Sequence, residues 1–470
     1  MSAPGERDTF YRSQSFWLDT VPGSLEPRPA LEGDAQADVV IVGAGYTGLW
    51  TAWYLKHHAP HLDVALVEAD IAGFGASGRN GGWCTAYLSG LDGWLEEDAS
   101  RAGGVALLRD MMGAVDEVGR VACLEAIDCH YDKSGHYAVA VNPSQLQRDQ
   151  EEVRWWRSMG IGEADIREVG AAEIDQRMHV EGALGGYFMP HCAAIHPARL
   201  ARGLARAVVA RGGRLYECSP VTRLRDDGVE TPGGTLKASV VLLATEGFTN
   251  TIKGLEQRLI PVHSMMIATE KLTEAEIEAT GLRRRHTWNN GKHLTTYGQL
   301  TQDGRIAFGS RGRYNWASGI ETRFDDAEPL FAEVRAELGS IFPVLRDKAI
   351  THAWGGPMGV ARSLQPAVVF DQGRRRGWAG GYFGDGVGAA NLAGRTLADL
   401  VLERDTERSR AIWVNPPGLK APPARAWEPE PLRWLAIKAR YAVMGWADAA
   451  EAKNAPSAKR WNHLLEKVFP

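Results

Sequence analysis

The stretch ADVVIVGAGYTGLWTAWYL, residues 37–55, decides the fold of this chain. Residues 39–42 are four consecutive β-branched apolar residues, which is typical of a buried strand in a parallel sheet. Residues 46–58 then follow a helical pattern, and residues 63–68, with the sequence DVALVE, form a second apolar strand. Together the three segments predict a βαβ unit of about 30 residues.

Gly43, Gly45 and Gly48 form a G-x-G-x-x-G pattern where the first strand meets the helix. The first glycine permits a tight turn, the second lets a pyrophosphate approach the backbone, and the third lets helix and strand pack closely. The start of the helix adds free N–H groups and a positive dipole end. Glu68 follows about 20 residues later, where its carboxylate can accept hydrogen bonds from both ribose hydroxyls. The pattern predicts an adenine dinucleotide.

Two further glycine-rich segments favour FAD over NAD. In residues 73–82 (GFGASGRNGG) seven of ten residues are small, so the backbone can lie flat against a planar ring. A merely flexible loop is the alternative. Residues 380–388 (GGYFGDGVG) lead into a predicted helix at 389–402, whose start can stabilise negative charge on a reduced flavin. A nicotinamide enzyme does not need this second site.

These motifs resemble the FAD-dependent D-amino-acid oxidase/glycine oxidase/sarcosine oxidase superfamily, and within it the bacterial γ-glutamylputrescine oxidase branch. The resemblance covers about residues 36–405 and rests on residues 39–55 with 64–70, 75–83, 243–245 and 381–400. It implies an α/β fold (α+β overall): a Rossmann-like FAD-binding domain with an inserted antiparallel-sheet substrate domain. It also implies non-covalent FAD, because residues 354–358 contain no cysteine.

The resemblance implies a role for each matching residue. The glycines of the first turn meet the pyrophosphate, Glu68 the adenosine ribose, and the loop at 75–82 the flavin and its phosphates. Val221 touches adenine, Ala244 and Thr245 lie near the adenosine, and residues 384–388 line the isoalloxazine. The expected cofactor-binding residues are Gly43, Gly45, Tyr46, Thr47, Gly48, Glu68, Ala69, Gly75, Ala76, Ser77, Arg79, Asn80, Gly81, Gly82, Val221, Ala244, Thr245, Gly384, Asp385, Gly386, Val387 and Gly388.

Two residues depart from the family pattern. Asp385 stands where the family often has histidine. A carboxylate facing the anionic edge of a reduced flavin is unfavourable, so we expect Asp385 to cap the following helix instead. Glu246 replaces the usual glycine or asparagine after Ala244 and Thr245.

The activity that the resemblance implies is FAD-dependent oxidation of an amine or amino acid. Hydride transfer to the flavin gives an imine that is hydrolysed to an aldehyde or keto acid, and O₂ is the preferred acceptor, giving H₂O₂. The resemblance of the loop at 75–82 to the γ-glutamylputrescine oxidase branch implies a γ-glutamyl-polyamine as one specific substrate. Three alternatives remain: a dehydrogenase with another acceptor, an NAD-dependent dehydrogenase, and a non-catalytic or nucleic-acid-modifying flavoprotein.

Candidate catalytic residues come from segments expected near the flavin. Arg311, like Arg313, can hold a substrate carboxylate bidentately, although a solvated arginine at a strand end explains each as well. Tyr297 and Tyr382 can line the ring face or simply pack. His263 is a candidate titratable group. No metal is expected, because His191, Cys192 and His196 fit no zinc spacing.

Composition limits the remaining possibilities. With 44% apolar residues the chain can bury a full core, and a net charge of −5 argues against nucleic acid as the main partner. No stretch approaches the ~18 apolar residues of a membrane span, and the first 14 residues lack the apolar core of a secretory signal. Five cysteines without a C-x-x-C pair fit a reducing cytosol. We expect a cytoplasmic monomer or homodimer.

Periodicity and turns predict the domain organisation. Helices are expected at 105–126, 143–159, 197–211 and 327–341, strands at 137–141, 214–218 and 239–244, and an antiparallel sheet from 262–269, 294–297 and 305–310. The expected division is an irregular lead-in at 1–36, an FAD-binding domain at 37–110, 191–260 and 349–410, a substrate domain at 111–190 and 261–348, and a proline-rich linker with a helical tail at 411–470.

Overall fold

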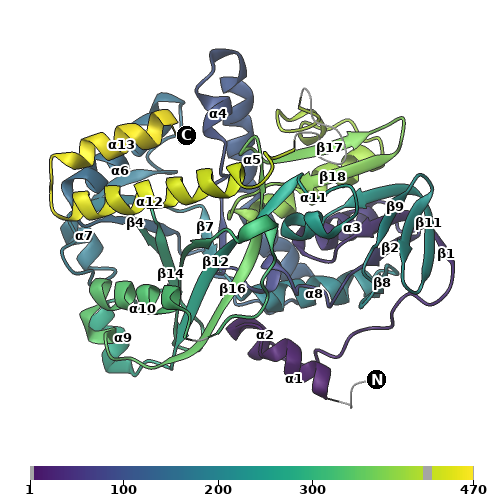
Figure 1. Cartoon of the computed structure of the whole chain (residues 1–470), viewed down its shortest axis with the longest axis horizontal. Helices are drawn as coiled ribbons and strands as arrows, with labels where there is room; N and C mark the ends of the chain where they lie inside the picture. Colours follow the sequence, from purple (N-terminus) through teal and green to yellow (C-terminus); the bar gives the residue numbers. More distant parts are fainter. Residues whose placement is uncertain (1–4, 326, 417–425, 469–470) are drawn as a thin grey trace.

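The computed structural model describes residues 5–325, 327–416 and 426–468, apart from the side chains of Arg311 and Val468. Two eight-stranded sheets organise these residues, the first to the right and the second to the left in Figure 1. The α/β fold predicted from the sequence is confirmed. Short 3-10 turns complete the described elements: η1 (Ala76–Gly78), η2 (Glu246–Thr251), η3 (Trp316–Ser318), η4 (Pro343–Leu345) and η5 (Arg408–Arg410).

The first sheet has a parallel centre. Its order is β17-β18-β11-β1-β2-β8, and the β9–β10 hairpin extends β11. Strand β1 pairs in parallel with both β2 and β11, and its residues 39–42 are fully covered on both faces. The strands are β1 (Ala35–Val42), β2 (Val64–Val67), β8 (Arg214–Tyr216), β9 (Arg223–Arg225), β10 (Gly228–Thr231), β11 (Gly234–Leu243), β17 (Ala367–Asp371) and β18 (Arg376–Gly380).

One large apolar core covers a face of this sheet. It is formed by the helices α3 (Tyr46–His58), α5 (Asp98–Leu124), α8 (Pro197–Ala210) and α11 (Gly386–Val401), with the short α4 (Asp92–Leu95) beside α5. Helices α3 and α11 pack directly on each other, and both begin at the carboxyl end of a central strand. The βαβ unit predicted from residues 37–68 is therefore confirmed.

The second sheet has the order β16-β12-β15-β14-β13-β4-β6-β5. Its neighbouring strands pair antiparallel, as predicted, except β13 and β4, which run parallel. These two strands lie far apart in sequence, so no hairpin sets their relative direction. The strands are β4 (His136–Ala140), β5 (Arg167–Gly170), β6 (Gly185–Met189), β12 (Leu259–Thr269), β13 (Thr287–Asn290), β14 (Thr296–Leu300), β15 (Ile306–Arg313) and β16 (Ile350–Ala361).

Helices flank this sheet. A separate two-stranded ribbon completes the β-structure of the described residues. The helices are α6 (Pro143–Ser158), α7 (Ala171–Asp175), α9 (Glu274–Thr280) and α10 (Pro329–Ile341). The ribbon consists of β3 (Trp83–Thr85) and β7 (Cys192–Ala194), which pair antiparallel. The domain boundaries remain a prediction; β16 bonds along β12, although its residues fall in the predicted FAD-binding segment 349–410.

The N-terminal lead-in is not irregular as expected. It contains α1 (Glu6–Arg12) and α2 (Phe16–Asp19), and Trp17 is 1% exposed. Ser15 Oγ donates to the carbonyl of Gly78 at 3.0 Å, and Trp17 Nε1 to that of Asn80 at 2.7 Å. The aromatic cluster at residues 10–18 therefore packs the lead-in against the glycine-rich loop, which its proline and charge content did not suggest.

The C-terminal tail, which the sequence predicts to be helical, forms two helices, α12 (Leu432–Ala452) and α13 (Ser457–Val468). In Figure 1 the tail is yellow, and α12 lies across the second sheet. Asp448 of α12 accepts the backbone N–H groups of His293 and Leu294 at 2.8 and 3.0 Å. Residues 417–423 of the predicted linker lie outside the described residues. None of the described helices combines the length and apolar character needed to span a membrane.

The packing of α3 on β1 depends on Gly48. A Cβ atom at Gly48 would lie 2.0 Å from the carbonyl oxygen of Gly43 and 3.2 Å from Ile41 Cγ2. We expect Gly48→Ala to lower the free energy of unfolding by about 1–3 kcal/mol, the usual range for overpacking, and to lower the FAD content of the purified protein. Chemical denaturation and the visible spectrum measure the two effects.

Gly113 in α5 provides the matched control. A Cβ atom there meets nothing within 4 Å. Gly113→Ala should leave FAD content unchanged and stabilise by about 0.5–1 kcal/mol, because alanine is the better helix former. Equal effects of the two substitutions would contradict the packing role of Gly48.

Candidate active site

A cavity of about 510 Å³ lies where the carboxyl ends of β1, β2 and β11 face the second sheet. Its volume is typical of a ligand pocket, and this edge of a parallel sheet is where ligands bind in such folds. One end is formed by the turn before α3, by Glu68 and by the segment after β11. The other end is formed by residues of the second sheet and by the loops that follow β3 and β18. We call these the sheet-1 end and the sheet-2 end.

The turn before α3 has room for backbone alone. Gly43 has a φ of +100°, and a Cβ atom there would lie 2.6 Å from the carbonyl oxygen of Ala244. At Gly45 a Cβ atom would lie 3.0 Å from Ser77 Oγ, which accepts the N–H of Tyr46 at 2.9 Å. The first turn of α3 thus presents N–H groups to the cavity, and this cradle fits a pyrophosphate.

Glu68 is held by the backbone at the end of β2. Its Oε2 accepts the N–H of Ala44 at 2.7 Å, and its Oε1 accepts the N–H of Asp70 at 3.1 Å. Burial raises the pKa of the Glu68 carboxyl to about 7. Val221, Ala244 and Thr245 line the same end of the cavity. These residues fit the adenosine part of FAD, with Glu68 placed to accept ribose hydroxyls.

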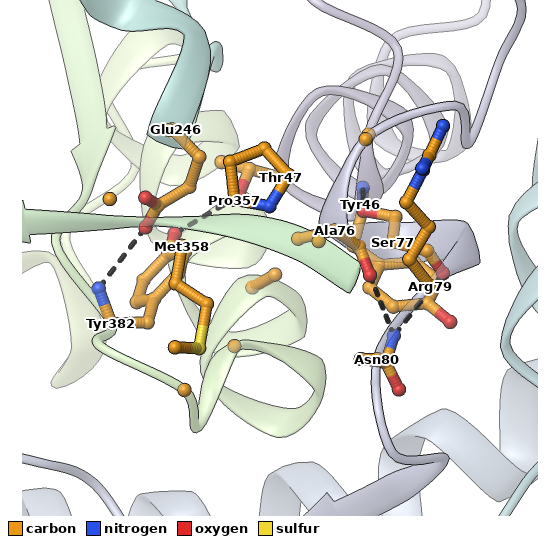
Figure 2. A pocket seen from close by; sticks show the side chains of 18 of the residues that line it. Tyr46, Thr47, Ala76, Ser77, Arg79, Asn80, Glu246, Pro357, Met358 and Tyr382 are labelled. Atoms are coloured by element: carbon orange, nitrogen blue, oxygen red, sulfur yellow. Dashed lines mark hydrogen bonds between the residues drawn. The ribbon is translucent and has the colours of Figure 1, made fainter. Parts of the chain in front are cut away.

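The glycine-rich loop is stiffened by Asn80. Its Nδ2 donates to the carbonyls of Ala76 at 3.1 Å and Ser77 at 3.2 Å, and its Oδ1 accepts the N–H of Gly82 at 2.8 Å. Figure 2 shows Ala76, Ser77 and Asn80 together on one side of the cavity. The loop predicted to bind the cofactor therefore has internal hydrogen bonds and forms one wall of the cavity. These bonds argue against the alternative of a merely flexible loop.

Arg79 connects this loop to distant parts of the chain. Its guanidinium donates to carbonyl oxygens of Phe74 at 2.8 Å, Thr322 at 2.7 Å and Gly355 at 3.3 Å, and to Gln14 at 3.3–3.4 Å. The side chain is 1% exposed, and burial lowers the pKa of the guanidinium to about 10. Arg79 lines the cavity, but these contacts fasten it to the lead-in and to the second sheet.

Glu246 fastens the second glycine-rich segment. Its Oε1 accepts the N–H groups of Gly381 at 2.8 Å and Tyr382 at 3.1 Å, and Tyr382 in turn bonds Thr47 Oγ1 at 3.1 Å (Figure 2). Burial raises the pKa of the Glu246 carboxyl to about 7. The sequence marked Glu246 as a departure from the family; the structure shows that it ties the segment before α11 to the first sheet.

Asp385 does not cap α11, contrary to expectation. The residue occupies the N-cap position, but its side chain makes no capping hydrogen bond. Its Oδ2 instead accepts the N–H of Ser89 at 3.0 Å and the Ser89 hydroxyl at 2.6 Å. The loop after β3 lies beside the start of α11 and offers two donors, so the carboxylate turns to it and lines the cavity.

Aromatic rings form a continuous wall at the sheet-2 end. Ring centroids lie 6.3 Å apart between Tyr187 and His136, 4.9 Å between His136 and Trp83, and 5.4 Å between Trp83 and Tyr297. Burial lowers the pKa of His136 to about 4, so the imidazole is neutral at pH 7. His136 and Tyr187 escaped the sequence analysis because they lie on β4 and β6, and no local motif signals how those strands pair.

The predicted cofactor residues line the cavity, with three exceptions. Gly48, Gly82 and Gly388 lie behind it and permit close packing: a Cβ atom at Gly82 would lie 2.6 Å from the carbonyl of Ile195, and one at Gly388 2.7 Å from that of Thr85. Their binding roles, like those of the residues in the lining, remain predictions.

Of the predicted catalytic residues, Tyr297 and Tyr382 line the cavity. His263 does not: it is fully buried, its Nε2 accepts the N–H of Glu321 at 3.0 Å, and burial lowers its pKa to about 4. The backbone of Arg311 pairs with Ser264, but its side chain lies outside the described atoms. Arg313 forms ion pairs with Glu321 and Glu328, so its charge is already matched.

One group of metal-ligand residue types occurs among the described side chains, at His293, Asp448 and Glu451. Asp448 accepts two backbone N–H groups, and Glu451 accepts Arg148 at 2.6 Å and Asn462 at 2.8 Å. These bonds account for the cluster: its side chains hold α12 against residues 293–294, which connect two strands of the second sheet.

The family described as DAO, FAD dependent oxidoreductase, matches residues 38–400. The chain belongs to this family. The resemblance inferred from the sequence is thus confirmed, and the description of the family names FAD as the cofactor. The tail that carries α12 and α13 lies outside the matched residues.

Curated relatives cover most of the chain. It is 31% identical over 401 residues to the γ-glutamylputrescine oxidoreductase of Escherichia coli, which covers 82% of this chain and 88% of that protein. It is 30% identical over 433 residues to the probable oxidoreductase OrdL of Rhizobium meliloti, covering 83% and 89%.

Solved structures share the fold. Glycine oxidase from Geobacillus kaustophilus matches with a TM-score of 0.66 and 19% identity, covering 79% of this chain and 96% of that one. Iminodiacetate oxidase from Chelativorans matches with a TM-score of 0.63 and 19% identity, covering 80% and 99%.

Glu68→Gln tests the adenosine end of the cradle. Glutamine keeps the size of the side chain but loses the charge that, above the Glu68 pKa of about 7, strengthens hydrogen bonds from the ribose. A hydrogen bond to a charged group contributes about 1.5–3 kcal/mol, so we expect FAD to bind about 10- to 100-fold more weakly. Titration of the apoprotein with FAD measures this. Glu333→Gln, at an exposed position of α10, is the control, and equal affinities in both variants would contradict the assignment.

Glu246 should make stability depend on pH. Its folded pKa of about 7 lies above the ordinary value of 4.5, so the folded state favours the protonated form. This contribution is present below about pH 4.5 and is lost as the pH rises to about 7. Glu246→Gln cannot ionise, so its free energy of unfolding should rise relative to wild type between pH 5 and pH 8, by about 1–3 kcal/mol. Urea titrations at several pH values measure the difference, and parallel curves would refute it.

Proposed function

We propose that this protein oxidises an amine or amino acid by hydride transfer to non-covalently bound FAD. The imine that results is hydrolysed to an aldehyde or keto acid, and O₂ is reduced to H₂O₂. The observation that carries the proposal is the cavity itself, which connects a dinucleotide cradle at α3 with an aromatic chamber at the second sheet. The names of the relatives support the substrate class, since they are γ-glutamylputrescine oxidoreductase, glycine oxidase and iminodiacetate oxidase.

The residues of this chain bind the cofactor, orient the substrate and exclude water from the site. FAD, when bound, supplies the hydride acceptor. Hydride removal from carbon is the difficult part of the reaction, and the cofactor makes it possible. The start of α11 directs its positive dipole end into the cavity through Gly386 and Val387, where it can stabilise negative charge. The aromatic wall from Tyr187 to Tyr297 keeps the reacting carbon in an apolar setting. His136 is neutral at pH 7 and both of its ring nitrogens are hydrogen-bonded, to Thr287 and Asn289, so it would not serve as a base and the substrate amine would have to arrive in its neutral form.

Non-covalent attachment is supported by the residues around the cavity. Among the described lining residues none is a cysteine, and both ring nitrogens of His136 are engaged at 3.1 and 3.2 Å. Acid precipitation should therefore release all of the flavin into the supernatant. Flavin that stays with the pellet would contradict this part of the proposal.

Anaerobic reduction tests the activity. The purified protein should be yellow, and its visible flavin absorption should bleach when one compound from a panel of amines and amino acids, γ-glutamylputrescine included, is added. Return of the colour on admitting air, with H₂O₂ formed, supports the oxidase; a flavin that stays reduced in air but passes electrons to an artificial dye would favour a dehydrogenase. A protein that takes up no FAD, or whose flavin no compound reduces, would refute the proposal.

A further inference from the structure

The histidine of the aromatic wall does not supply a base for the substrate. A primary amine has a pKa of about 10.4, like the lysine side chain, so nearly all of it is an ammonium in solution at pH 7. An ammonium nitrogen has no free electron pair to assist hydride loss from the adjoining carbon. Both ring nitrogens of His136 are hydrogen-bonded, and burial lowers its pKa to about 4. Another group has to take the proton if the amine is to be neutral at the flavin.

Tyr87 connects the cavity with a carboxylate outside it. The residue follows β3 and lines the sheet-2 end of the cavity. Its hydroxyl donates to Oε1 of Glu152 on α6 at 2.6 Å, and Glu152 is not part of the lining. A tyrosine hydroxyl that donates its proton can still accept another through a lone pair. A proton can therefore enter at Tyr87 and continue to Glu152.

The carboxylate is held in position to receive that proton. Trp156, one turn further along α6, donates its Nε1 to the same Oε1 of Glu152 at 2.7 Å. The bond from Tyr87 has the length expected of a hydrogen bond between a hydroxyl and a charged carboxylate. Glu152 is half-buried, so a proton that it has accepted can later pass to water.

The surroundings of Glu152 strengthen it as a base. Burial raises the pKa of the Glu152 carboxyl, and the nearby carboxylate of Asp92 on α4 raises it further, although the hydrogen bonds from Tyr87 and Trp156 oppose the shift. Burial and the Glu152 carboxylate also raise the pKa of Tyr87 well above its ordinary value of 10. Tyr87 therefore stays protonated and acts as a bridge, and the proton rests on Glu152.

The other charged groups around this pair are mostly acidic. Burial raises the pKa of Asp149, three residues before Glu152 on α6, to about 7, and the adjacent Arg148 opposes that shift. Glu96 lies near Asp92 on the side of α4. The carboxylates of Asp149 and Asp385 both lie close enough to Tyr187 to raise its pKa. This acidic setting favours a proton held on Glu152.

We propose that Tyr87 and Glu152 form a proton relay, through which an amine that enters the cavity as an ammonium becomes neutral before its hydride leaves. An N–H bond of the ammonium breaks and its electron pair stays on nitrogen. The proton goes to the Tyr87 oxygen as the hydroxyl proton of Tyr87 goes to Glu152 Oε1. Glu152 holds the proton during hydride transfer and gives it to water after turnover. The proposal rests on the proposed function and names how that function obtains a neutral amine.

The pH dependence of flavin reduction tests the relay. The probe is γ-glutamylputrescine, or the compound of the panel that bleaches the flavin fastest, and the second-order rate constant of anaerobic reduction is measured from about pH 7.5 to about pH 10. In the wild-type holoenzyme the proton stays within the complex, so we expect this rate constant to change less than about threefold. A rise of about tenfold per pH unit would mean that only neutral amine from solution reacts, and would overturn the inference.

Two variants remove the relay in different ways. Tyr87→Phe deletes the hydroxyl, whereas Glu152→Gln keeps an oxygen that accepts hydrogen bonds but cannot take the proton. With unchanged flavin spectra, both should react about 100-fold more slowly than wild type near pH 8 and within a few-fold of it near pH 10, where neutral amine is abundant. A loss of the same size at every pH would show a merely structural role and would contradict the relay.

Two further variants complete the experiment. Glu151→Gln, at an exposed position of α6, should match wild type at every pH. Asp385→Asn tests the rival acceptor, because Asp385 lines the cavity directly. If Asp385→Asn recovers at high pH and Tyr87→Phe does not, the proton goes to Asp385, so the inference fails while the proposed function stands. If no compound reduces the wild-type flavin at any pH, the proposed function fails, and the inference fails with it.

Discussion

At the carboxyl ends of β1 and β11 the chain segments lie so close together that no side chain fits between them. The rest of the site depends on that constraint. Because Gly43 touches Ala244 with no side chain between them, α3 can begin at the sheet edge, beside the cavity. Glu68 reaches the same edge from β2 and bonds the N–H of Ala44. The position of the pyrophosphate cradle, and hence of the whole cavity, follows from this packing.

The second glycine-rich segment lies opposite the first because charged side chains fasten both. Glu246 binds the segment before α11, and Arg79 binds the loop before β3. Each is buried, and most of the hydrogen bonds that each forms are to backbone groups. Glycine-rich walls gain little from packing, so polar cross-links of this kind give the cavity a defined shape.

How much the sequence predicted depends on the range of the interaction. The β1–α3 turn, Glu68, Ser77 and Asn80 sit within local motifs that the sequence analysis singled out, and they line the cavity, although their role in binding the cofactor stays a prediction. The aromatic wall was missed, because His136 and Tyr187 reach it through pairing of strands that no nearby residue specifies. The same reason explains Asp385: its partner Ser89 is almost 300 residues away in sequence, so a local capping rule was the wrong guide. His263 shows the opposite error. Its residue type suggested a catalytic role, but the fold buries it outside the cavity.

The contacts of Arg79 also bear on how the holoenzyme is made. One guanidinium gathers oxygens from Gln14, Phe74, Thr322 and Gly355, which span nearly the first three quarters of the chain. During synthesis the glycine motif and Glu68 leave the ribosome early, but the loop predicted to face the flavin lacks the carbonyls of Thr322 and Gly355 until β16 has been made. The loop therefore has its full set of Arg79 contacts only after most of the chain has been made, and we expect stable loading with FAD to be a late event.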